Sequence, residues 1–91
     1  MPKISRIAWA PSFKRAFRKR VIGTPEEQIF RRRLQEFIED PFAPGLKTHK
    51  LTGALSGLWA FSINYNCRVI IDFISQEEVI LIDIGTHDDV Y

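Results

Sequence analysis

The apolar residues of this chain change their spacing once, and that change constrains the fold more than any other feature. Between residues 13 and 38 they recur at three- and four-residue intervals, the spacing of an amphipathic helix. From Trp59 onward they alternate with polar residues or form short runs, which is typical of strands. Helices followed by strands predict an α+β fold, with two N-terminal helices packed on one face of a small antiparallel sheet.

Two helices are expected in the first half of the chain. The first carries an apolar stripe at Phe13, Ala16, Phe17 and Val21. Gly23 is expected to end this helix. The next helix begins with a capping-box pattern, in which Thr24 is the N-cap, Pro25 the first helical residue and Glu27 the acidic partner. It runs to about Asp40, and a loop rich in proline follows.

Strands are expected on both sides of the helices. Residues 4–9 form the first strand, and a second carries Trp59, Phe61, Ile63 and Tyr65 on one face. A turn at 64–66 leads into strands at 68–74 and 79–84, so the last three strands form an antiparallel meander. The predicted order is β-α-α-β-β-β in a single domain of residues 1–91, with the other face of the sheet free as a working surface.

Length and composition limit the class of protein. Ninety-one residues with 45% hydrophobic side chains suffice for one core. No apolar run approaches the ~20 residues of a membrane span, and the N-terminus lacks the hydrophobic region of a signal peptide, so we expect a soluble, cytoplasmic protein without a membrane partner. The single cysteine, Cys67, is most simply a small buried hydrophobe. The two histidines lie far apart without zinc-ligand spacing, so no metal or other cofactor is expected.

Positive charge is concentrated in the first half of the chain. Residues 1–50 contain twelve Lys and Arg residues and five acids, whereas residues 51–91 contain one and six. Basic runs at 18–20 and 31–33 would give a helix face a positive field that suits phosphate or an acidic partner segment, although a solvated helix surface is the alternative for each run. The one cation of the second half, Arg68, begins an apolar strand and must reach the sheet edge or find an anion.

The last seven residues collect groups that can transfer protons. Gly85 is expected to permit a bend after the last strand, and the imidazole of His87 and the phenol of Tyr91 follow it. Groups of these types within the reach of one turn can move protons or stack on a base, so the segment predicts a site. The two carboxylates between them, Asp88 and Asp89, are expected to be capping or surface acids.

The order of these elements and three local patterns resemble the RelE/ParE superfamily of bacterial type II toxins, closest to its YafQ and RelE-like branch. The patterns are Lys-Thr-His-Lys-Leu-Thr-Gly at 47–53, Arg-Val-Ile at 68–70 and Gly-Thr-His-Asp-Asp-Val-Tyr at 85–91. The resemblance covers almost the whole chain. It implies a toxin that inhibits protein synthesis as a metal-independent endoribonuclease, which cuts messenger RNA, often on the ribosome, through attack of the ribose 2′-hydroxyl on the adjacent phosphate.

The resemblance also implies roles for individual residues and partners for the chain. His49 and His87 match the catalytic histidines of YafQ-like toxins, and Tyr91 matches their terminal aromatic residue, which can stack on a base or relay a proton. Arg68 matches the phosphate-binding arginine of RelE- and YoeB-like members. Three positions depart from the pattern, where Ser62, Cys67 and Asp83 replace a histidine, an acid and an arginine. The implied partners are messenger RNA with the ribosome and an acidic, partly disordered antitoxin segment that wraps the basic half.

Cleavage by this route needs a base for the 2′-hydroxyl, an acid for the departing 5′-oxygen and cations for the charge on the phosphorane. Histidine titrates near neutral pH, so His87 is expected to be the principal acid or base and His49 its counterpart. Arg68 offers a planar pair of donors to phosphate oxygens. Lys47 and Lys50 flank the first histidine as point charges.

Other interpretations stay open at this point. Either histidine could be a polar surface residue, and Arg68 could form an ion pair with Asp72 on its own strand or with Asp83 across the sheet. ParE-like members of the superfamily inhibit DNA gyrase and cut nothing, and a non-catalytic nucleic-acid- or protein-binding module would use the basic helices alone. Assays of RNA cleavage beside gyrase supercoiling separate these possibilities.

Overall fold

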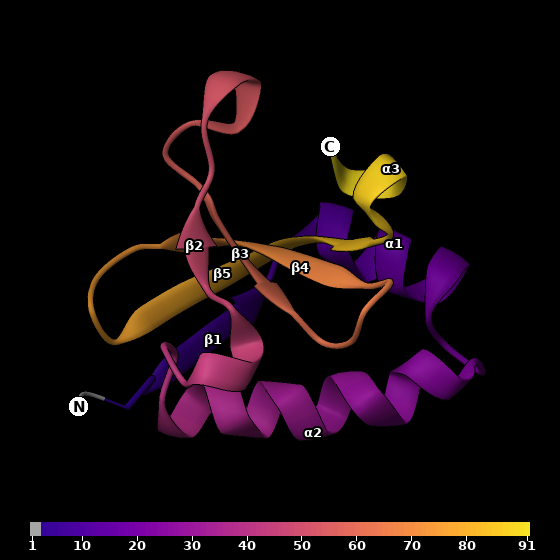
Figure 1. Ribbon diagram of the computed structural model, residues 1–91, viewed down its shortest axis with the longest axis horizontal. Coiled ribbons are helices and arrows are strands. Elements are labelled where there is room, and N and C mark those ends of the chain that lie inside the picture. The colour runs from indigo at the N-terminus through magenta and orange to yellow at the C-terminus, as the bar shows by residue number, and fades with distance from the viewer. Residues whose placement is uncertain (1–2) are drawn as a thin grey trace.

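The computed structural model describes residues 3–91, which form a five-stranded sheet with two main helices (Figure 1). The elements in chain order are β1 (Arg6–Trp9), α1 (Pro11–Arg20), α2 (Pro25–Glu39), the 3₁₀ turn η1 (Pro44–Leu46), β2 (His49–Lys50), the 3₁₀ turn η2 (Gly53–Leu55), β3 (Trp59–Ser62), β4 (Arg68–Phe73), β5 (Glu78–Gly85) and the short helix α3 (His87–Val90). The predicted α+β class, with two helices before a late meander, is confirmed. None of the helices in the described part of the chain is long and apolar enough to cross a membrane.

The strands lie in the order β1-β5-β4-β3-β2. The meander β3-β4-β5 is antiparallel, as predicted. β1, however, pairs in parallel with β5, so the sheet is mixed and not wholly antiparallel. Parallel pairing is possible because the chain crosses over through the helices between β1 and the rest of the sheet. The strand β2, missing from the predicted order, pairs with β3, and its two residues are too few to show a period.

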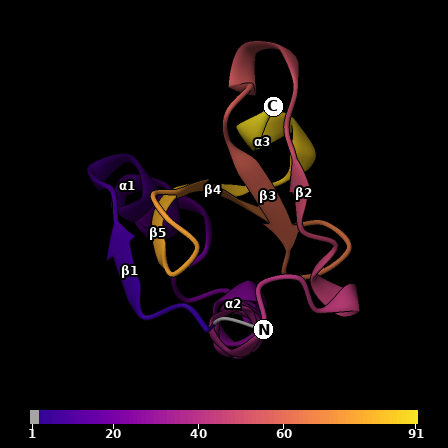
Figure 2. The ribbon, with the colours of Figure 1, turned by 90° about the vertical axis from the view of Figure 1, so that its left-hand side faces the viewer.

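Aromatic side chains from both helices fill the core. Phe13 and Phe17 of α1 lie 5.8 and 5.4 Å from Phe30 of α2, measured between ring centroids. Phe37, further along α2, stacks on Phe61 of β3 at 4.5 Å. All five rings are buried, and they join the two helices to one face of the sheet. The β2–β3 hairpin and α3 stand on the other side of the sheet from α2 (Figures 1 and 2).

The predicted capping box at the start of α2 is wrong in its contacts. Thr24 is the N-cap residue, but its hydroxyl donates to the carbonyl of Val21 and makes no cap hydrogen bond. Glu27 accepts a hydrogen bond from the backbone N–H of Gly23 at 2.9 Å. Gly23 adopts a left-handed conformation (φ 79°), which supports a tight connection between α1 and α2 and brings these alternative partners within reach.

The predicted turn at 64–66 is confirmed, but the predicted continuation of the strand face to Tyr65 is wrong. β3 ends at Ser62, and the side-chain oxygen of Asn64 then accepts a hydrogen bond from the N–H of Asn66 at 2.9 Å. This Asx turn ends the alternation of the strand before Tyr65. Tyr65 is 91% exposed in consequence.

Candidate active site

The register of the sheet places two predicted site residues on its open face. His49 lies opposite Ala60, and two residues further along β3 Ser62 lies opposite Arg68. The alternate positions of β3 and β4, such as Phe61, belong to the core beneath the sheet. Because successive side chains of a strand point to opposite faces, those of His49, Ser62 and Arg68 emerge on the face away from the core.

A cavity of about 490 Å³ opens between the β2–β3 hairpin, β4 and α3, and we call it the hairpin cavity. Its lining residues are His49, Lys50, Leu51, Thr52, Ala54, Leu55, Arg68, His87 and Tyr91. Five of the six predicted site residues therefore line one cavity, although they come from three separate parts of the chain. The sixth, Lys47, lies outside it.

The C-terminal helix α3 holds His87 and Tyr91 together. Thr86 and Asp89 form a reciprocal capping box, in which each backbone N–H donates to the other side chain at 2.9 and 3.2 Å. The hydrogen bond from the Thr86 N–H holds the pKa of the Asp89 carboxyl below its ordinary value. One turn of helix then brings the ring of Tyr91 to 4.5 Å from that of His87, edge to face at 70°. The prediction that Asp89 is a capping acid is confirmed.

Arg20, from a basic run expected at the surface or on phosphate, instead ties α1 to the end of β5. Its Nη1 donates to the carboxylate of Asp83 at 3.1 Å and to the carbonyl of Ile84 at 2.9 Å. Its Nε lies 4.0 Å from the carboxylate of Asp89. This role could not be predicted from the sequence, because a run of three cations gives no sign of which one turns toward the sheet.

Arg68 is left without an acidic partner. Asp83, the proposed cross-sheet partner, is bound to Arg20. Among residues 3–91 no carboxylate lies within 4.0 Å of the Arg68 guanidinium, so the pairing with Asp72 is not formed either. The interpretation of Arg68 as one half of a structural ion pair is therefore wrong, and its donors are available to an anion in the cavity.

The environment of the other titratable groups limits their roles. Burial raises the pKa of Tyr91, and the nearby positive charge of Arg68 opposes that rise only in part. The phenol is therefore protonated at neutral pH and can donate a hydrogen bond. Burial raises the pKa of Cys67 to about 11, so this thiol is the small buried hydrophobe that was predicted. No three His, Cys, Asp or Glu side chains gather as metal ligands within residues 3–91.

The two lysines beside His49 have different surroundings. The ammonium of Lys50 lies over the indole of Trp59, 5.5 Å from the ring centroid. Lys47 has a left-handed backbone (φ 52°), and its carbonyl lies 2.9 Å from Nδ1 of His49. A carbonyl can only accept, so this hydrogen bond requires the tautomer in which Nδ1 carries the proton. In the neutral ring Nε2 is then an acceptor.

Gly85 is required by close packing and not, as predicted, by a bend. It is the last residue of β5 and has no left-handed backbone. A Cβ at this position would lie 2.6 Å from the Cβ of Asp89 and 3.0 Å from Nη1 of Arg20. Both neighbours belong to the contacts that hold α3 against the sheet.

Gly85→Ala is therefore expected to push α3 away from β5. Overpacking of this kind destabilises a protein by about 1–3 kcal/mol, which for a chain of this size lowers Tm by roughly 4–8 °C per kcal/mol. Thermal denaturation measures the change. Gly45→Ala is the matched control, since its Cβ would meet only the flexible end of Arg33 at 3.3 Å. Equal Tm values for the two variants would show that α3 is not packed as described.

Comparisons with known proteins identify the fold. No family model matches this sequence, and no curated protein sequence matches it. Solved structures do match, and they include structures described as bacterial toxins and as a toxin–antitoxin complex. YafQ from E. coli superimposes with a TM-score of 0.79 at 13% identity, over 93% of this chain and 96% of that chain.

Two further structures support the same assignment of fold. A copper-bound mutant toxin from Helicobacter pylori matches with a TM-score of 0.72 at 20% identity, over 94% of this chain and 98% of that chain. The DinJ–YafQ toxin–antitoxin complex of E. coli matches with a TM-score of 0.72 at 14% identity, over 93% and 94%. The chain therefore has the RelE/YafQ-like fold that the sequence patterns predicted.

Proposed function

We propose that this chain is the toxin of a type II toxin–antitoxin module and acts as an endoribonuclease that cuts messenger RNA and so inhibits protein synthesis. One observation carries the proposal: His49, Arg68, His87 and Tyr91 line a single cavity on the open face of the sheet. The fold shared with YafQ supports the toxin role. The proposed substrate is translated in the cytoplasm, where we expect the protein to act.

The contacts of the two histidines favour a division of roles. His49 has Nδ1 on the carbonyl of Lys47, which leaves Nε2 of the neutral ring free to accept the proton of a 2′-hydroxyl. His87 lies across the cavity at the start of α3, where its protonated ring would donate to the departing 5′-oxygen. We assign His49 as the general base and His87 as the general acid.

Arg68 and Tyr91 complete the proposed site. Arg68 rises from β4 between the two histidine-bearing elements, and its planar group can bind two phosphate oxygens as negative charge builds on the phosphorane. Tyr91 lies edge to face with His87 and is 45% exposed, so a base can stack on the accessible part of its ring. The proposed steps use these side chains alone.

Tyr91→Ala is expected to remove most of the cleavage activity, whereas Tyr91→Phe should retain most of it. Loss of base stacking corresponds to a decrease of roughly 5- to 100-fold, while the Phe ring keeps the stacking face. Thermal stability should change little in either variant, because Tyr91 is half exposed and lies outside the core cluster. The measurement is the rate of RNA cleavage beside a thermal melt. Full activity of Tyr91→Ala would favour the gyrase-inhibitor interpretation.

An antitoxin is the partner that we propose for the unpaired basic side chains of the two main helices. In the described residues the side chains of Lys14, Arg15, Arg18, Lys19 and Arg32 form no ion pair within 4.0 Å. Unpaired cations of this kind on α1 and α2 suit an acidic, partly disordered segment that folds on binding. The DinJ–YafQ complex shows that a toxin of this fold assembles with an antitoxin. Purification of the chain together with the product of the neighbouring gene tests this partner.

Two parallel assays test the function itself. The purified chain is added to a translation reaction, where cut messenger RNA is mapped by primer extension, and to a gyrase supercoiling reaction. We expect RNA cleavage and normal supercoiling. Loss of supercoiling with intact RNA would instead identify a ParE-like inhibitor. Cleavage of free RNA compared with ribosome-bound RNA shows whether the ribosome is a required partner.

A further inference from the structure

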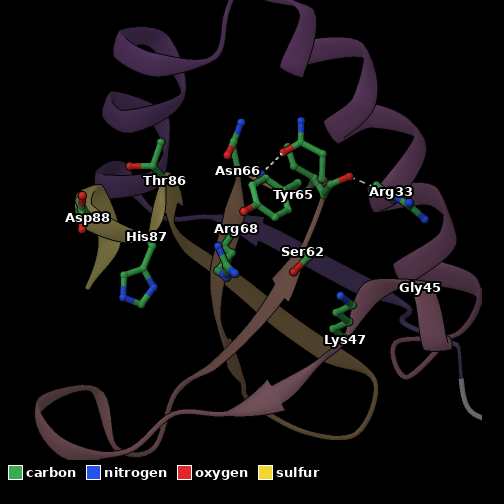
Figure 3. A pocket seen from close by; sticks show the side chains of 12 residues that line it. Arg33, Gly45, Lys47, Ser62, Tyr65, Asn66, Arg68, Thr86, His87 and Asp88 are labelled. Atoms are coloured by element: carbon green, nitrogen blue, oxygen red, sulfur yellow. Dashed lines mark hydrogen bonds between the residues drawn. The ribbon is translucent and has the colours of Figure 1, made fainter.

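A second cavity, of about 720 Å³, adjoins the hairpin cavity and shares Arg68 and His87 with it. We call it the turn cavity, because it extends from Arg68 to the turn between β3 and β4 (Figure 3). The residues that line the turn cavity on the side of the turn include Lys47, Ser62, Asn64, Tyr65 and Asn66. Its volume lies in the range of small-molecule sites, which is about 300–1,000 Å³.

The turn that carries Tyr65 is fixed on both sides. The N–H of Ile63, a fully buried residue, donates to the carbonyl of Cys67 at 3.0 Å, which closes the turn. The Nε of Arg33 on α2 donates to the carbonyl of Ile63 at 3.1 Å. Tyr65 itself is 91% exposed and contacts no other aromatic ring among the described residues. Because these hydrogen bonds already hold the backbone, a flat ligand that stacks on the exposed ring has to order only the two side-chain torsions of Tyr65.

Cleavage of an RNA phosphodiester requires room for a nucleotide on each side of the phosphate. Arg68 and His87, the proposed phosphate ligand and acid, line both cavities, so the phosphate would lie where the cavities meet. Tyr91 lines only the hairpin cavity and Tyr65 only the turn cavity. Each side of the phosphate thus has one exposed phenol, and each phenol can stack on one base.

We propose that the turn cavity is a second nucleotide subsite, in which the base next to the cut stacks on Tyr65 and the adjoining phosphate lies near Lys47. This inference rests on the proposed ribonuclease function. Lys47 has no acidic partner within 4.0 Å among the described residues, so its ammonium is available to a phosphate. The amide of Asn66 offers a donor and an acceptor to a base edge.

The test uses the full chain and a short RNA that it cannot cut. Once the cut site is mapped, an oligonucleotide with a 2′-deoxy sugar at the attacking position carries the fluorescent base 2-aminopurine on one or the other side of the phosphate. Stacking on a tyrosine quenches the fluorescence. We expect Tyr65→Ala to relieve the quenching of 2-aminopurine on one side of the phosphate only, and Tyr91→Ala to relieve it on the other side only. Tyr65→Ala should also weaken RNA binding by roughly 5- to 100-fold.

Two controls accompany the variant. Tyr65→Phe keeps the stacking face and should bind and quench as the wild type does. Ile22→Ala removes another exposed apolar side chain, 53% exposed and outside both cavities, and should change nothing. Thermal melts of the two Tyr65 variants should coincide with that of the wild type, since Tyr65 makes no core contact.

The outcomes separate the subsite from the function. If the wild type cuts RNA but Tyr65→Ala binds and quenches like the wild type, the subsite is wrong and the function stands. Relief of quenching on both sides in Tyr65→Ala would also overturn the assignment of one tyrosine to each base. If the wild type neither binds nor cuts RNA, with or without ribosomes, both proposals fail together.

Discussion

His87→Gln is expected to lower the rate of RNA cleavage by about 10²- to 10⁴-fold, the usual contribution of a general acid. His87 lines both cavities and is the one proposed donor to the departing 5′-oxygen. Gln keeps the size and a hydrogen bond but cannot transfer a proton at neutral pH. The fold should persist, because α3 contains no buried residue. Single-turnover cleavage of a defined RNA measures the change.

Asp88→Asn provides the matched control for this substitution. It alters the adjacent exposed residue of the same helix, which also lines the turn cavity, and removes a negative charge that would repel RNA, but no proposed proton carrier. Cleavage by this variant should not fall. A folded His87→Gln protein that cuts RNA at the wild-type rate would exclude His87 from the mechanism.

The elements that could be predicted from the sequence are those whose side chains repeat with a clear period. The stripe of phenylalanines in α1 and α2 is buried against the sheet, and the meander follows from apolar runs separated by short polar turns. Pairing between β1 and β5 joins segments about 70 residues apart, and no local pattern encodes its direction. The strand β1 was predicted, but its parallel pairing was therefore missed, as was the two-residue strand β2.

The residues of the candidate site could be predicted from the sequence, but the contacts that hold them in place could not. His49, Arg68 and His87 stand at the ends of elements next to recognisable turns, and a resemblance of short patterns indicates them. Arg20 supports α3 through contacts with a strand more than 60 residues away, and its neighbours in sequence look alike. Gly85 was identified for the wrong reason, since crowding by Asp89 exists only in the folded chain.

Tyr65 shows how a strand pattern can conceal an exposed aromatic residue. Counted with Trp59, Phe61 and Ile63, it continues an alternating apolar pattern. The hydrogen bond from the Asn66 N–H to the Asn64 side chain replaces the backbone pairing of a strand. The resulting Asx turn leaves Tyr65 exposed to solvent. An exposed aromatic residue beside a cavity is a candidate for ligand contact, whereas a buried one is a candidate for packing.

Arg68→Ala is expected to lower cleavage by about 10²- to 10³-fold, the loss seen when a donor to a developing oxyanion is removed. RNA binding should weaken as well, because Arg68 is the one cation of residues 51–91 and lies where both cavities meet. Stability should change little, since no acid is left unpaired when the guanidinium is removed. Cleavage rates and equilibrium binding of an uncuttable RNA measure the two effects separately.

Arg68→Lys distinguishes geometry from charge. Lysine keeps the positive charge but offers a single ammonium in place of a planar pair of donors. If two phosphate oxygens are bound more tightly in the transition state than in bound RNA, the cleavage rate should fall substantially while RNA affinity changes only modestly. Arg20→Lys makes the same change at an arginine that is not proposed to contact phosphate, since Arg20 binds Asp83 and the carbonyl of Ile84 and lines neither cavity. Wild-type cleavage by Arg68→Lys would mean that Arg68 contributes only a general positive field, and the two-pronged contact with phosphate would have to be abandoned.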